Sequence, residues 1–186
     1  VDEKILGGSV EEGLADKGME TDNLYYDKVR ITLDKVSFAV VTHQRAEEVK
    51  AGDIMDAGIM VFGSPTGAAT IEVSPYLNRL VCTNGMISPV NIGRWAHRGG
   101  EGGSLFDWTK EMTLASWDAI DGELDALRSL TEVEVDGNVH NVMADLFERH
   151  HVPVRLRESI MEAAIEEHDG TLFGISQAFN RVRSEE

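Results

Sequence analysis

Residues 29–42 read VRITLDKVSFAVVT, and apolar and polar side chains alternate along both halves of this segment. The apolar residues stand two positions apart on either side of a central Asp-Lys pair: Val29, Ile31 and Leu33, then Val36, Phe38 and Val40. A period of two is typical of a β-strand with one buried face. The segment therefore predicts either a pair of strands or one long bent strand.

Two further apolar runs extend the predicted sheet. Residues 57–62 (AGIMVF) and 69–73 (ATIEV) flank the segment 63–67, GSPTG, whose glycine and proline residues favour a tight loop. Residues 76–87 are mostly apolar and are interrupted at Asn84-Gly85, a pair that favours a turn. We therefore expect residues 29–73 to form an antiparallel sheet, within a strand-rich region over residues 29–90.

From residue 105 onward the apolar residues recur at intervals of three and four, which is typical of amphipathic helices. Helices are expected over residues 105–127, after a cap at Asp136, over 157–168 and over 172–182, with one alternating stretch at 131–135. The predicted fold class is α+β, an antiparallel strand meander in the N-terminal half followed by packed helices over 105–183. Residues 1–24 are expected to be a flexible or weakly helical lead-in, and residues 25–186 a single domain.

The charge of the chain limits its partners. The 186 residues include 17 basic and 33 acidic side chains, for a net charge of −16, and 42% are hydrophobic. This composition supports a sizeable core and excludes a disordered chain. The charge excludes a uniformly basic coat for duplex DNA and argues against binding to anionic membranes. No apolar run is long enough to span a bilayer and no signal peptide is visible after Val1, so we expect a cytoplasmic protein without a membrane partner.

Residues 73–100 contain no acidic side chain, in contrast to the rest of the chain. Arginine offers a forked donor for phosphate, and tryptophan can stack on a base, so this acid-free segment is suited to single-stranded nucleic acid. The predicted nucleic-acid-binding residues are Arg79, Asn84, Arg94, Trp95, His97 and Arg98. For Arg79 the structural alternative is an arginine whose stem packs on the core and whose head pairs with a carboxylate.

Other chemistry-bearing residues favour structural roles. Cys82 is the only cysteine, and its apolar neighbours predict a buried, unreactive thiol rather than a nucleophile activated by His97. The four histidines of the helical half have no partner at metal-ligand spacing, and the acidic run over residues 118–125 fits a solvated helix face better than a divalent-ion site. Phosphate-loop, dinucleotide-binding, zinc-protease and serine-hydrolase motifs are absent from the sequence. We predict no cofactor, no metal and no catalytic residue.

A resemblance to a known protein family adds to these patterns. Ser64 and Gly67 fit a Ser-x-x-Gly turn, residues 79–86 (RLVCTNGM) fit the pattern Arg-x-Val-Cys-x-Asn-(Gly/Thr)-(Met/Leu), and His97-Arg98 fit a following basic stretch. Residues 170–181 (GTLFGISQAFNR) fit a closing helix, with Asn180 where Thr is usual. On these residues the chain resembles the phage and plasmid-like proteins of domain-of-unknown-function family 932. The resemblance implies that family's fold and a phage or plasmid genome, and it implies no catalytic residues.

The sequence leads to two functional hypotheses from different classes. The first is a phage- or plasmid-encoded accessory protein of DNA metabolism, a non-catalytic single-strand-binding or strand-annealing module. One acidic protomer offers only the few basic residues of segment 73–100 to a nucleic acid. We therefore expect a homo-oligomer, in which this short basic segment recurs in every protomer. The alternative is an acidic protein-interaction or virion-associated component, or a DNA mimic, whose net charge attracts basic protein partners. No set of acid, base and nucleophile in the sequence supports an enzyme.

Overall fold

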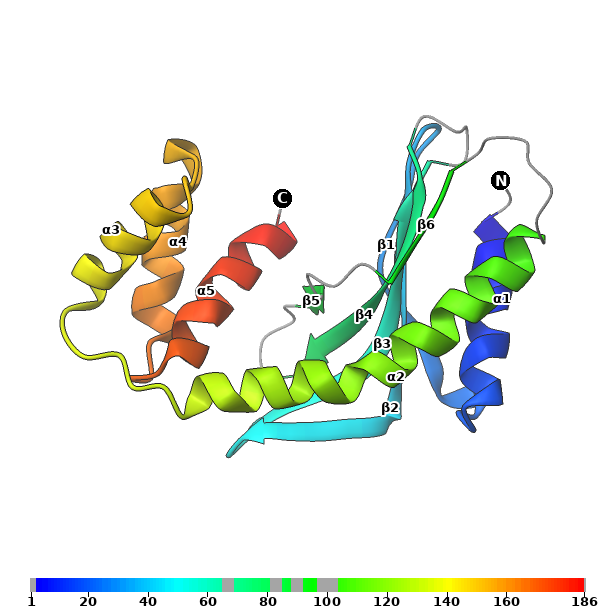
Figure 1. The fold of residues 1–186 in the computed structure, drawn as a ribbon, viewed down its shortest axis with the longest axis horizontal. Helices are drawn as coiled ribbons and strands as arrows, with labels where there is room; N and C mark the ends of the chain where they lie inside the picture. Colours follow the sequence, from blue (N-terminus) through cyan, green and yellow to red (C-terminus); the bar gives the residue numbers. More distant parts are fainter. Residues whose placement is uncertain (1–2, 65–68, 81–84, 88–91, 97–103, 186) are drawn as a thin grey trace. The chain divides into compact units, whose positions relative to one another are not determined.

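The computed structural model describes residues 3–64, 69–80, 85–87, 92–96 and 104–185 (Figure 1). Its strands are β1 (Leu24–Ile31), β2 (Val36–Lys50), β3 (Asp53–Gly63), β4 (Ile71–Arg79), β5 (Gly85–Ile87) and β6 (Gly93–Trp95). Its helices are α1 (Glu3–Asp16), the 3-10 turn η1 (Thr21–Asn23), α2 (Leu105–Thr131), α3 (Val139–Arg149), α4 (Val154–Glu167) and α5 (Leu172–Glu185). The strands form one sheet in the order β1–β2–β3–β4–β5, and β6 also pairs with β4. The predicted α+β fold, an antiparallel sheet followed by helices, is confirmed.

The chain, for which a single domain over residues 25–186 is the prediction from sequence, divides into two compact units. Unit 1 comprises residues 1–48 and 52–123, and unit 2 comprises residues 49–51 and 124–186, so the division falls within α2. Helices α3, α4 and α5 bury apolar side chains among themselves, which gives unit 2 its own core. The buried members of this core are Met143, Phe147, Ile160, Ala163, Ala164, Ile175, Ala178 and Val182.

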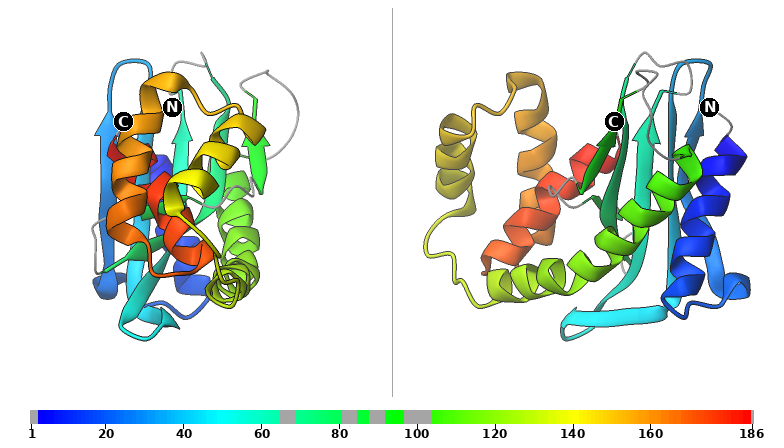
Figure 2. Two further views of the ribbon diagram at one scale, coloured as in Figure 1. Left: turned by 90° about the vertical axis from the view of Figure 1, so that its left-hand side faces the viewer. Right: turned by 45° about the vertical axis from the view of Figure 1, so that its right-hand side comes forward.

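The N-terminal segment is a packed helix, not the flexible or weakly helical lead-in that its glycine content suggested. Leu6, Val10 and Leu14 stand four residues apart, lie on one face of α1 and are fully buried. Gly13 allows α1 to approach α2 closely, because a Cβ at this position would lie 2.8 Å from Cγ2 of Thr113. Within unit 1, α1 and the first part of α2 lie on the same face of the sheet (Figure 2).

The alternating segment forms a pair of strands, β1 and β2, joined by a turn at residues 32–35. Their register places Tyr26 opposite Val40 and Ile31 opposite Val36. Helix α1 does not cover the whole hairpin: Val29, Ile31 and Leu33 are 55%, 54% and 94% exposed. The sequence pattern therefore predicts the strands correctly, but these three residues do not enter the core.

The opposite face of the sheet carries a second apolar cluster, formed by Ala39, Val41, Met60 and Tyr76. Gly58 on β3 lies against β2 here, since a Cβ at Gly58 would lie 2.5 Å from the carbonyl oxygen of Val40. This close approach leaves no room for a side chain between the two strands.

The helices of unit 2 correspond to the predicted helices, but most of them begin or end at other residues than predicted. Residues 131–135 make one isolated bridge, between Glu134 and Thr171, and not a strand. The cap of α3 is Asn138, whose side chain accepts a hydrogen bond from the His140 amide, rather than Asp136. No helix in the described part of the chain is both long enough and apolar enough to cross a bilayer.

Candidate functional site

The six predicted nucleic-acid-binding residues divide into two groups. Arg79, Arg94 and Trp95 belong to described strands. Asn84, His97 and Arg98 lie outside the described residues, as does Cys82, so the predictions for them stay predictions. The positions of Arg79, Arg94 and Trp95 therefore show which parts of the predicted interface lie together in the structure.

Arg79 ends β4, and its guanidinium is bound by a carboxylate of the same sheet. Its Nε donates to Oδ1 of Asp53 at 2.7 Å, and its Nη2 donates to Oδ2 at 2.6 Å. Arg79 is 9% exposed and Asp53 is 7% exposed, so this is a two-pronged ion pair removed from water. The antiparallel pairing of β3 with β4 brings the start of one strand to the end of the other. Arg79 thus matches the structural alternative, an arginine whose head pairs with a carboxylate of the core.

Arg94 and Trp95 are neighbours in β6, and their side chains leave opposite faces of the strand. Arg94 lies opposite Glu72 of β4, and the two form an ion pair with 2.8 Å between Nε of Arg94 and Oε1 of Glu72. The Arg94 side chain is nevertheless 67% exposed. Trp95 instead packs against Trp108 of α2, with ring centroids 5.4 Å apart. The expected combination of a cation and a stacking ring on one surface is therefore not formed by this pair.

The structure also assembles a polar cluster that the sequence analysis missed. On the face opposite α1, the Tyr25 hydroxyl donates to Oδ2 of Asp56 at 2.9 Å and accepts from Nδ2 of Asn78 at 3.0 Å. Nδ1 of His43 pairs with the same oxygen of Asp56, and the His43 ring stacks on Tyr25 at 4.7 Å. Four consecutive strands each contribute one of these residues, so the cluster connects β1 to β4.

Asp56 holds the imidazole of His43 in place. The carboxylate is fully buried, whereas the His43 side chain is 65% exposed. A carboxylate bound to one nitrogen of an imidazole orients the ring, so the exposed His43 ring is held in a fixed position from which it can contact a ligand. Among the described residues, however, no group of three or more His, Cys, Asp or Glu side chains is arranged to hold a metal ion. The sequence feature that could have revealed this cluster is Asp56, a carboxylate that interrupts the apolar run over residues 54–62.

All three tyrosines of the chain donate their hydroxyls to carboxylates of unit 1. Tyr76 donates to Oδ2 of Asp27 at 2.6 Å, and Tyr26 donates to Oε1 of Glu11 at 2.6 Å. Burial, together with the hydrogen bond to Asp56, raises the pKa of Tyr25 to about 12. Burial and the neighbouring carboxylates raise the pKa of Tyr26 and Tyr76 well above the usual value as well.

These tyrosines predict a loss of stability at alkaline pH. In the unfolded chain they ionise near the ordinary pKa of 10.0, whereas in the folded chain they keep their protons to higher pH. Their contribution is complete below pH 10 and is lost as the pH rises through the raised values. We expect tyrosinate absorbance at 295 nm to appear together with loss of circular dichroism, above pH 10. Ionisation with a midpoint near pH 10 and an unchanged dichroism spectrum would contradict this expectation.

Comparisons with protein-family models, with curated proteins and with solved structures found no match for this chain. The resemblance to domain-of-unknown-function family 932 therefore stays a prediction from residues 58–100 and 170–181.

Proposed function

We propose that the chain is a non-catalytic module that binds single-stranded nucleic acid and acts as an oligomer, in the setting of phage or plasmid DNA metabolism. The observation that carries the proposal is the position of Arg94. Its side chain is 67% exposed on β6, inside the acid-free segment 73–100 and shortly before His97 and Arg98 in the sequence. In a chain of net charge −16, this segment is the least costly place for a phosphate to bind.

The contact between Arg94 and Glu72 is compatible with this role. The contact uses Nε of Arg94, and a guanidinium carries further N–H donors, so a phosphate can bind Arg94 without displacing Glu72, whose side chain is only 13% exposed. Trp95, packed on Trp108, anchors β6 and thereby the backbone that carries Arg94. One protomer still offers few cations. An oligomer that repeats the basic residues of segment 73–100 would present a longer binding surface to single-stranded nucleic acid.

Replacing Arg94 and Arg98 together by alanine is expected to weaken single-strand binding with little loss of stability, because Arg94 is mostly exposed. The slope of log affinity against log salt should become shallower by about 0.7 for each phosphate that the variant no longer binds. The measurement is fluorescence anisotropy of a labelled oligonucleotide at several salt concentrations, with urea unfolding of each variant.

Arg149→Ala is a matched control for this experiment. Arg149 is 71% exposed and pairs through its Nε at 2.7 Å with Asp145, which is 54% exposed where Glu72 is 13% exposed, and it belongs to unit 2. It should leave both the affinity and the salt slope unchanged. Absence of any anisotropy signal for the native protein at low salt and micromolar concentration would refute the nucleic-acid hypothesis.

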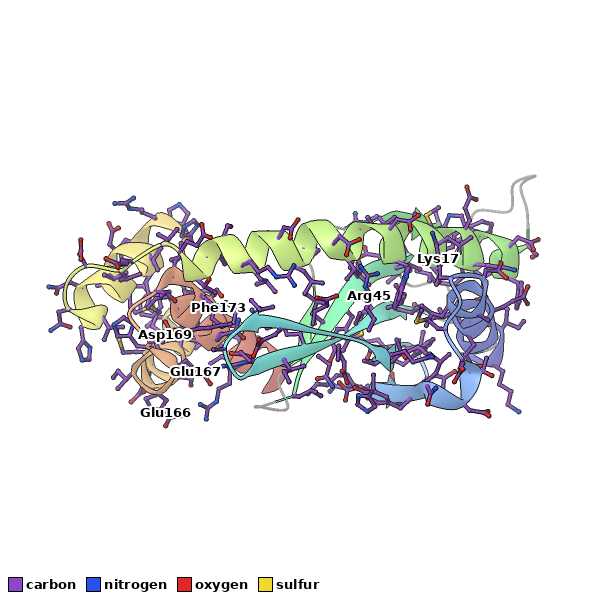
Figure 3. All side chains as sticks on the ribbon, turned by 90° about the horizontal axis from the view of Figure 1, so that it is seen from below. Lys17, Arg45, Glu166, Glu167, Asp169 and Phe173 are labelled. Atoms are coloured by element: carbon purple, nitrogen blue, oxygen red, sulfur yellow. The ribbon has the colours of Figure 1, made fainter. Side chains whose placement is uncertain are left out.

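A second candidate, an acidic component that binds a basic protein, is favoured by the surface of α2. Asp118, Asp121 and Asp125 present side chains that are 66%, 78% and 76% exposed along this helix. Lys17 and Arg45 pair with the first two of them (Figure 3). This candidate predicts no oligonucleotide binding and salt-sensitive binding of a polyarginine probe, which Asp125→Asn should weaken.

A further inference from the structure

The nucleic-acid contact built on Arg94 lacks a ring on which a base can stack, because Trp95 packs against Trp108 of α2. Single-stranded nucleic acid is held by stacking of its bases on aromatic side chains as well as by charge. An exposed ring fixed on the sheet face that carries Arg94 would supply this contact. The imidazole of His43 in β2 has these properties.

The strand registers place His43 and Arg94 on the same face of the sheet. At one end of this face, the side chain of Asp56 in β3 pairs with His43. Six residues further along β3, Phe62 lies opposite Glu72 of β4, and Glu72 lies opposite Arg94 of β6. Every second residue of a strand points to the same face, so Asp56 and Phe62 share a face and lie roughly 20 Å apart along the strand.

The His43 ring is held along one edge and on one of its two faces. Nδ1 pairs with the buried carboxylate of Asp56, and the ring stacks on Tyr25 with centroids 4.7 Å apart and planes inclined by 27°. The His43 side chain is nevertheless 65% exposed. Solvent therefore reaches the ring face that Tyr25 leaves uncovered.

Tyr25, the ring on which His43 stacks, is itself fixed by hydrogen bonds. Its hydroxyl donates to Oδ2 of Asp56 at 2.9 Å and accepts from Nδ2 of Asn78 at 3.0 Å. Side chains that are already ordered lose little conformational entropy when a ligand binds them. The pair of rings is therefore preorganised for a third ring that stacks on His43.

The cluster that orients His43 is maintained at a cost in stability. Asp56 is fully buried, and among the described residues its Oδ1 has no hydrogen-bond partner. A buried carboxylate oxygen without a partner is unfavourable, and the neighbouring Ala39, Val41 and Met60 form an apolar cluster on the same face. An apolar side chain at position 56 would avoid this cost, and local departures of this kind are typical of functional sites.

We propose that the exposed face of His43 is a stacking platform for a nucleobase of the same single strand whose phosphate binds Arg94. The inference rests on the proposed function and adds the kind of contact that Trp95 does not provide. Histidine is one of the side chains on which unpaired bases stack. Stacking uses the flat faces of both rings and needs no cation, so the buried charge of Asp56 does not oppose it. The distance along the strand means that the base and the phosphate belong to different nucleotides.

Fluorescence anisotropy with two labelled oligomers tests the proposal, one an ordinary oligodeoxynucleotide and the other an abasic strand with the same number of phosphates. The native protein should bind the oligomer with bases about fivefold to a hundredfold more tightly than the abasic one. His43→Ala should remove this preference and leave the affinity for the abasic strand unchanged. The slope of log affinity against log salt should also stay unchanged, because no phosphate contact is lost.

Two further variants serve as controls. His43→Phe keeps a flat ring at this position and should retain most of the preference for the oligomer with bases. His140→Ala removes an exposed histidine of unit 2 and should leave both affinities unchanged. Circular dichroism of each variant verifies that it is folded, and the comparison of the two oligomers on the native protein needs no variant at all.

Equal binding of the two oligomers by the native protein overturns the proposal, while the proposed function stands. A shallower salt slope for His43→Ala would mean that His43 binds a phosphate, and the proposal would be wrong. The same would follow if His43→Phe lost the preference as fully as His43→Ala, because the ring nitrogens and not the ring face would then make the contact. If the native protein binds neither oligomer, the proposed function fails and the stacking platform fails with it.

Discussion

Replacing Arg79 by alanine is expected to lower the free energy of unfolding by about 3–5 kcal/mol, because it leaves the carboxylate of Asp53 buried without its counter-charge. Asp53 is only 7% exposed, and two hydrogen bonds from Arg79 reach its two oxygens. Urea unfolding followed by circular dichroism measures this decrease directly.

Two further variants show whether the cost comes from the unpaired charge. Arg149→Ala breaks the pair with Asp145, in which the two side chains are 71% and 54% exposed, and should change stability by no more than about 1 kcal/mol. The double variant Arg79→Met with Asp53→Leu removes both charges and should recover most of the stability that Arg79→Ala removes. Equal effects of Arg79→Ala and Arg149→Ala would mean that the Asp53 carboxylate is solvated in solution.

Gly58→Ala is expected to destabilise unit 1 by about 1–3 kcal/mol, because the new methyl group overlaps the backbone of β2. The Cβ would lie 2.5 Å from the Val40 carbonyl oxygen and 3.0 Å from Cα of Val41. These are backbone atoms of a neighbouring strand and cannot rotate away as the end of a side chain can. Thermal unfolding of the variant would report the effect as a lower Tm.

Gly122→Ala is the matched control for Gly58→Ala. Gly122 lies within α2, and a Cβ there meets no atom within 4 Å. The same chemical change should therefore stabilise the protein by about 0.5–1 kcal/mol, because alanine is the better helix former. If Gly58→Ala leaves the Tm unchanged or raises it, as Gly122→Ala should, the close approach of β2 and β3 at Gly58 is relaxed in solution.

The strands and helices of this chain are largely readable from the spacing of apolar residues. A period of two over residues 29–42 predicted β1 and β2, and intervals of three and four predicted α2 to α5, because these periods follow directly from backbone geometry. Helix α1 was underestimated because its glycines lower helix propensity. Its stability instead comes from tertiary packing of Leu6, Val10 and Leu14.

The candidate site was less readable because its chemistry depends on pairings between distant parts of the chain. The alternative for Arg79 was foreseeable from its apolar surroundings, but the identity of its partner, Asp53, follows from the register of β3 and β4. The cluster of His43 and Asp56 needs four strands in register to exist at all. The sequence shows where basic residues are frequent, but it does not show which carboxylate each of them pairs with in the folded chain.

Strand β1 has a further consequence for the behaviour of the protein at high concentration. It is an edge strand, and its pairing with β2 is interrupted by a bulge between Asp27 and Arg30, where Lys28 has a φ of 51°. A flat edge strand offers its free amides and carbonyls as a template for strand addition, whereas a bulge and a lysine at this position distort that template. The hairpin can therefore remain exposed without templating the edge-to-edge addition of strands by which amyloid fibrils grow.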